Sequence, residues 1–108
     1  MSNTGNSVKD DSIRELAAGS LTTSYQSLPG GVLLRDAFRL VITNNTNGDV
    51  YFTTDTTRNT KKFPAYSGRI LDDKSDDMYR KAGTQWSVKW DAAPGAPVGW
   101  VAVEVEYV

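Results

Sequence analysis

The residues in this sequence that look most able to do chemistry are four aspartates close together, Asp72, Asp73, Asp76 and Asp77. Carboxylate oxygens are the ligands that Ca²⁺ prefers, and a pair of carboxylates can hydrolyse a glycosidic bond. The spacing does not match an EF-hand loop, and Lys74 lies inside the cluster. No sequence feature places two of these side chains across a cleft. We therefore expect an exposed, metal-free loop.

The chain lacks the residues on which most enzymes depend. It contains neither histidine nor cysteine, so the commonest general base, the commonest metal ligand and every thiolate mechanism are missing. Serine and threonine are plentiful, but neither a Ser-x-x-Lys motif nor a glycine-rich phosphate loop accompanies them. The sequence therefore predicts a protein that is not an enzyme, with no catalytic residues, no cofactor and no bound metal.

Three tryptophans, Trp86, Trp90 and Trp100, lie within 15 residues of one another. Aromatic side chains on a small β-domain fill the core, stack on sugars or anchor protein interfaces. Trp86 and Trp90 share one side of a predicted strand with Val88, and this apolar side favours a core position for both tryptophans. Trp100 lies opposite the valine-rich side of the last strand and is the predicted exposed anchor. A carbohydrate-binding module that uses Trp100 and the aspartate loop is the competing interpretation.

The charge pattern gives no electrostatic case for a nucleic-acid or membrane partner. The chain has 12 basic and 13 acidic residues, and the basic ones are scattered. Lys61 and Lys62 beside Phe63 could contact nucleic acid, but lysines also protect sheet edges, which is the commoner reason for such a pair. The polar start resembles no secretory signal, and no apolar run reaches the roughly 20 residues that span a bilayer. We expect a soluble protein made in the cytoplasm.

The dominant pattern along the chain is alternation of apolar and polar residues with a period of two. Seven or eight short strands, with turn residues every 8–12 positions, predict an antiparallel β-sandwich that is jelly-roll-like or immunoglobulin-like. Its predicted core consists of Phe38, Leu40, Ile42, Phe52, Ile70, Trp86, Val88, Val101, Val103 and Val105.

The sequence pattern predicts some of the individual strands more clearly than others. Residues 38–54 read as a β-hairpin around Asn47-Gly48, because Asn-Gly tolerates positive φ in hairpin turns. Residues 100–108 alternate valines with polar side chains and form the clearest strand. Residues 61–65 suit a sheet edge, since Pro64 cannot donate to a ladder. Residues 20–26 and 78–80 are further strand candidates.

The first 18 residues differ from the rest. We expect residues 1–18 to be an arm that is flexible or contains one short helix, followed by a single β-sandwich domain at 19–108. Ser12 and Glu15 could form a capping box for a helix within residues 10–19. Ile13 and Leu16 would then share its apolar face and contact a partner.

Several stretches together resemble a known family. They are residues 19–25, 39–46, 49–53, 62–65 and 81–85, followed by a valine-alternating strand that ends in Tyr107. Their order is similar to that of small β-sandwich virion proteins of tailed bacteriophages, in which an N-N-T-x-x-D-V hairpin follows an R-I strand and an A-G-T-x step precedes the last two strands. The aspartate loop and the tryptophan content depart from that pattern.

The resemblance implies a structural role rather than a reaction. It implies a subunit on the capsid surface, as decoration or cement, or in the head–tail neck, as connector or adaptor. The implied partners are capsid, portal or neck and tail subunits and further copies of the chain. The implied location is the virion, after synthesis in the host cytoplasm. A carbohydrate- or receptor-binding module of a phage tail is the alternative.

Overall fold

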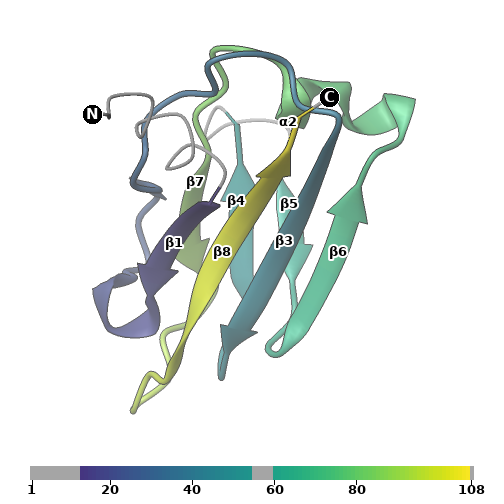
Figure 1. Cartoon of the computed structure of the whole chain (residues 1–108). Helices are drawn as coiled ribbons and strands as arrows, with labels where there is room; N and C mark the ends of the chain where they lie inside the picture. Colours follow the sequence, from purple (N-terminus) through teal and green to yellow (C-terminus); the bar gives the residue numbers. More distant parts are fainter. Residues whose placement is uncertain (1–12, 55–59, 108) are drawn as a thin grey trace, which may run out of the picture.

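The computed structural model describes residues 13–54 and 60–107 and places eight strands in two sheets (Figure 1). The strands are β1 (Ile13–Ala17), β2 (Gln26–Ser27), β3 (Arg39–Thr46), β4 (Val50–Thr53), β5 (Lys61–Phe63), β6 (Ser67–Leu71), β7 (Ser87–Trp90) and β8 (Gly99–Glu106). Three short helical turns, η1 (Ala18–Ser20), η2 (Lys74–Asp76) and α2 (Asp77–Arg80), complete the described elements.

Each sheet has four strands, and every pairing is antiparallel. Sheet A has the order β1-β8-β3-β6, and sheet B has the order β2-β7-β4-β5. The chain pairs like one long hairpin that has been rolled up, with the pairs β1·β8, β2·β7, β3·β6 and β4·β5. Successive pairs in this series alternate between sheet A and sheet B. This is the order of a jelly roll. The predicted antiparallel β-sandwich is confirmed, with the jelly-roll rather than the immunoglobulin connection.

The core lies between the sheets and agrees largely with the predicted set. Eight of its ten members are buried: Leu40, Ile42, Phe52, Trp86, Val88, Val101, Val103 and Val105. Phe38 and Ile70 were wrongly placed in the core, since they are 49% and 53% exposed. Phe38 precedes β3 at one end of the sandwich. Ile70 lies opposite Val41, and the neighbours of Val41 in β3, Leu40 and Ile42, are the ones that point inward.

The predicted hairpin at residues 38–54 is also wrong, because β3 and β4 belong to different sheets. The buried amide of Asn44 closes the corner between them: its Nδ2 donates to the carbonyls of Gly48, Phe63 and Pro64, and its Oδ1 accepts from the Thr46 hydroxyl. Gly48 does not have positive φ. A Cβ there would lie 3.0 Å from the Trp90 ring, so a larger residue would push against this buried side chain.

At the N-terminal end of the described chain the predicted helix is replaced by a strand. Ile13–Ala17 pairs with β8 along its whole length, so these residues of the predicted arm belong to the sandwich. Arg14 is buried, lies 5.2 Å from the Trp86 ring centroid and donates to the carbonyls of Gly31 and Val32. These contacts with distant residues outweigh the local helix signal. Residues 1–12 lie outside the described residues.

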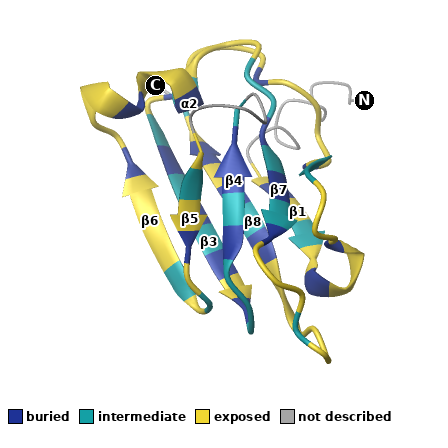
Figure 2. Ribbon diagram, turned by 180° about the vertical axis from the view of Figure 1, so that it is seen from behind, coloured by how far each residue is buried: buried dark blue, intermediate teal, exposed yellow. Residues whose placement is uncertain are grey.

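Two further strand predictions are corrected. Of residues 20–26, only Gln26 is in a strand, β2, and Met78–Arg80 forms most of helix α2 rather than a strand. Lys61–Phe63, in contrast, is the edge strand of sheet B, as Pro64 indicated. Figure 2, seen from behind, shows buried and intermediate positions in β4 and β7 of this sheet, and it shows β6 of the other sheet exposed over its three central residues.

Candidate interaction surface

The outer face of sheet A is not covered by any described segment, and it carries a shallow groove. The groove has a volume of about 300 Å³ and is lined by Ile13, Glu15, Val41, Thr43, Trp100, Ala102 and Glu104. These residues are brought together by the strand register, which aligns β1, β8 and β3 so that their outward-facing positions form continuous rows. The clearest row runs Ile13, Glu104, Val41, Ile70 across all four strands.

Two of the three predicted partner-binding residues meet on this face. Ile13 is 54% exposed and Trp100 is 37% exposed, and both line the groove. Leu16 does not join them, because it is half-buried against the core on the inward side of β1. Alternation in a strand separates Ile13 from Leu16, whereas a helix would have placed them on one side.

The groove also contains two carboxylates, Glu15 and Glu104. They are diagonal neighbours on adjacent strands, since Glu15 lies opposite Ala102 and Glu104 lies opposite Ile13. Neither makes an ion pair with another described residue, whereas Glu106 at the end of the sheet lies 3.8 Å from Arg39. The two carboxylates carry the same charge on neighbouring strands and repel each other, so a cation that bound between them would relieve the repulsion. The face therefore combines apolar contact area with a preference for positive charge.

Val41 and Ile70 are members of this face that the sequence reasoning missed. Both lie in strands with mixed apolar patterns. In Arg39–Thr46 the consecutive run Leu40-Val41-Ile42 contains one outward residue between two inward ones. Strict alternation applied to that run would have identified Val41. No local signal identifies Ile70, because its direction depends on its pairing with Val41.

The outer face of sheet B is different, because its polar groups pair with one another. Lys62 lies over Tyr51, and Lys89 lies between Tyr51 and Tyr25, in a row of alternating cations and aromatic rings. Lys62 also bridges Asp49 and Asp91, and the hydrogen bond and charge of Asp91 raise the pKa of its ammonium group above the usual 10.5. Phe63 is buried and offers no ring for stacking. These pairs stabilise the sheet and present few unsatisfied groups to a ligand.

The aspartate loop is partly built into the fold, contrary to the expectation of a fully exposed loop. Asp76 is buried and lies 3.4 Å from the Lys61 ammonium group, which ties η2 to β5. Asp77 accepts a 2.7 Å bond from Arg80. Within residues 13–54 and 60–107 no group of three acidic side chains converges in a way that could hold a metal ion.

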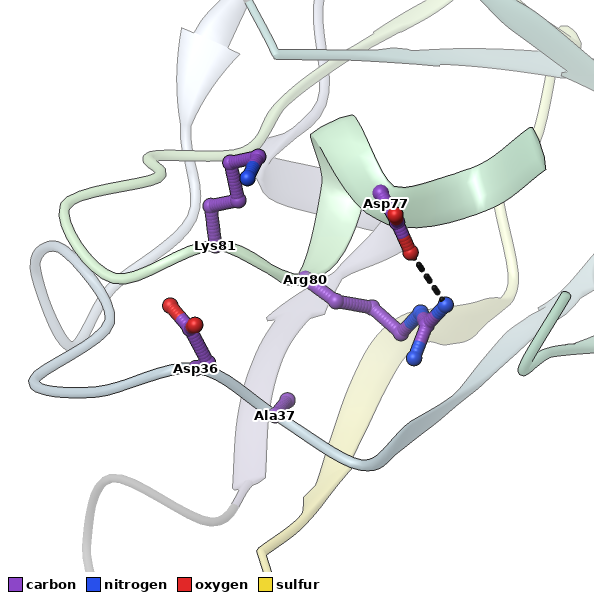
Figure 3. Close-up of a pocket in the computed structure, with 5 residues that line it drawn as sticks. All are labelled: Asp36, Ala37, Asp77, Arg80 and Lys81. Atoms are coloured by element: carbon purple, nitrogen blue, oxygen red, sulfur yellow. Dashed lines mark hydrogen bonds and ion pairs between the residues drawn. The ribbon is translucent and has the colours of Figure 1, made fainter. Parts of the chain in front are cut away.

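A small polar hollow beside this loop is also structural (Figure 3). It is lined by Asp36, Ala37, Asp77, Arg80 and Lys81. Besides Asp77, the Arg80 guanidinium donates to the carbonyls of Phe38 and Asp73, and Asp36 accepts the Ala82 backbone N–H at 2.8 Å. The charged groups thus hold the segment before β3 against α2. Most of the hydrogen bonds of Arg80 and Asp36 are made within the protein, although the buried Arg80 Nε has no hydrogen-bond partner among the described residues.

Comparisons with known proteins add no relative: no family model, no curated protein and no solved structure matches this chain. In the part of the chain that the structure describes, no helix is long and apolar enough to cross a membrane. The fold and the surface define the class at the level of architecture, a small jelly-roll sandwich with one uncovered sheet face. The resemblance to phage virion proteins stays a prediction.

Proposed function

We propose that this chain is a non-enzymatic structural component of a tailed-phage virion, which docks on larger subunits through the outer face of sheet A. The observation that carries the proposal is the groove on that face, where Ile13, Val41 and Trp100 surround two carboxylates without ion-pair partners among the described residues. Exposed aromatic and aliphatic anchors in a concave setting are typical of protein interfaces.

The architecture supports this proposal without deciding it. Jelly rolls are common among viral capsid domains, and they need no chemistry of their own to act as rigid building blocks. The near-neutral chain, with a formal net charge of −1, allows many copies to lie side by side without strong mutual repulsion. Both sites on the particle remain within the proposal: the capsid surface, as decoration or cement, and the head–tail neck, as connector or adaptor.

The docking partner is expected to present apolar side chains together with a lysine or arginine. Such a cation would lie near Glu15 and Glu104, and the apolar side chains would cover Trp100. Raising the ionic strength is expected to weaken the charged part of such an interface by screening, whereas the apolar contact is not screened.

Replacing Trp100 with serine is expected to reduce the amount of protein that co-sediments with purified particles by at least about tenfold, since aromatic anchors commonly contribute 2 kcal/mol or more to binding. The measurement is quantitative sedimentation of added variant with particles that lack the protein. Tyr66→Ser is the matched control, because Tyr66 is also an exposed aromatic but lies outside the groove. Equal retention of the two variants would contradict docking through this face.

A second candidate function follows from the same groove. An exposed tryptophan beside two carboxylates can stack on a sugar ring and accept hydrogen bonds from its hydroxyls, as in a carbohydrate- or receptor-binding module of a phage tail. Binding to a glycan array, measured with and without Ca²⁺, tests this alternative. Robust sugar binding that is lost in Trp100→Ser would favour the tail module over the structural role.

A further inference from the structure

The two strands at one side of the sandwich, β5 and β6, are both sheet edges, but β5 carries more of the features that protect an edge. β5 has three residues, carries Lys61 and Lys62, and is followed by Pro64. Short length, lysine and proline are the features that keep an edge from pairing with another chain. β6 has five residues and contains neither lysine nor proline, and its one charged side chain, Arg69, points to the core side of the strand.

The outer edge of β6 is open in the described structure. β6 is the last strand in the order β1-β8-β3-β6, and it pairs with β3 over five consecutive positions without a bulge. Figure 1 shows it at the border of its sheet, with no strand beyond it. The backbone groups on that side make no hydrogen bond to any described residue, and the exposed side chains next to them include Ile70. An open edge with an apolar side chain is a template for another strand.

We propose that β6 pairs antiparallel with β6 of a second copy of this chain, joining two sheets A into one continuous sheet of eight strands. The inference goes beyond the proposed virion role, because it concerns only the contact between two chains and holds with or without a particle. A second copy is the favoured occupant because its own β6 presents the same unpaired backbone N–H and carbonyl groups. Each copy offers the same open strand, so both sets of unpaired backbone groups are satisfied at once.

The side chains select the register of this pairing. Directly opposite residues of antiparallel strands point to the same side of a sheet, so a two-fold axis must pass through one residue position of β6. An axis at Arg69 would place two guanidinium groups opposite each other, which is unfavourable. An axis at Gly68 brings no side chains together. An axis at Ile70 sets two isoleucines in contact.

The Ile70 register also agrees with the rest of the face. In this register the row Ile13, Glu104, Val41, Ile70 of one copy continues into the same row of the second copy, read in reverse order. The register places Asp72 of one copy opposite Gly68 of the other, where no second side chain competes for the space, and Arg69 opposite Leu71 on the other side of the sheet.

The absence of cysteine from the sequence makes the register directly testable. In Ile70→Cys the two thiols would lie across the axis, and opposite Cα atoms in an antiparallel pair are about 4.5–5.5 Å apart, which is within the range of a disulfide. Under mild oxidation we expect a disulfide-linked dimer on a non-reducing gel. It should form at least roughly tenfold faster than in the control, because pairing raises the effective concentration of the thiols.

The matched control is Ile13→Cys. Ile13 is the same residue type on the same face, with exposure of 54% against 53% for Ile70, but it lies on the opposite edge strand. Cross-linking of Ile70→Cys at the rate of Ile13→Cys would overturn the proposal, provided that both variants show the β-sheet spectrum of the unmodified chain.

A second variant tests the pairing without any cross-link. Ile70→Lys introduces at the edge the charge that β5 already carries, and we expect it to sediment as a monomer at concentrations where the unmodified chain shows a dimer. An unmodified chain that stays monomeric at every concentration, or a dimer unaffected by Ile70→Lys, would overturn the proposal. Neither result bears on the Trp100→Ser experiment, so failure of the edge pairing and failure of the virion role are distinguishable.

Discussion

Gly99→Ala is expected to lower the free energy of unfolding by roughly 3–5 kcal/mol, a large part of the 5–15 kcal/mol available to a small domain. Gly99 begins β8 opposite Thr46, with a φ of +91°. A Cβ at this position would lie 1.8 Å from the backbone carbonyl oxygen of Asn45, which is far inside contact distance. The obstacle is backbone on the neighbouring strand, so no side-chain rotation can relieve it. The ends of β3 and β8 must separate.

Urea unfolding followed by circular dichroism measures this loss. Gly95→Ala is the matched control, because a Cβ at Gly95 meets no atom within 4 Å and its φ is not positive. The control is expected to stay within about 0.5 kcal/mol of the unmodified chain. If Gly99→Ala were as stable as Gly95→Ala, the pairing of β3 with the start of β8 would be incorrect.

Trp90→Ala is the second substitution with a large expected effect, a loss of about 3–5 kcal/mol. The ring is buried between the sheets and packs on Gly48 at the corner between β3 and β4. Its Nε1 donates to the Leu21 carbonyl at 3.1 Å, and its backbone N–H donates to the Thr22 carbonyl. Truncation leaves a cavity and an unsatisfied buried carbonyl together.

Phenylalanine substitutions separate the hydrogen bond from the packing. Trp86 is equally buried, but its Nε1 has no hydrogen-bond partner among the described residues. Trp90→Phe should therefore cost about 1–2 kcal/mol more than Trp86→Phe, since only the first removes a buried hydrogen bond. Equal losses in thermal and urea unfolding would show that the bond from Trp90 to Leu21 is not formed.

The sequence predicted best those elements whose pattern is local. In β8 three valines alternate with polar or small residues, and Trp86, just before β7, shares one side with Val88 and Trp90 of that strand, so both strands and their buried faces followed from periodicity alone. Asn47-Gly48 correctly indicated a turn. It could not indicate which sheet the next strand joins, because that choice depends on the buried contacts of Asn44 with Gly48 and with the distant Phe63 and Pro64.

The N-terminal segment and the groove on sheet A also depend on contacts between residues that are distant in the sequence. Ser12 and Glu15 with Ile13 and Leu16 fit a helix, but pairing with β8 and burial of the Arg14 side chain decide for a strand. Exposure of Trp100 followed from its position opposite the valines. Its meeting with Ile13 required the register in which Ala17 lies opposite Trp100, and no single-strand pattern contains that information.

The central claim, that the chain is a structural subunit of a phage particle, is tested most directly by its copy number in purified virions. Quantitative mass spectrometry against a major capsid protein measures that number. The account predicts a symmetric multiple: on the order of hundreds of copies for a capsid decoration, or about six to twelve for a neck or tail subunit. Absence of the protein from purified particles would contradict the structural role.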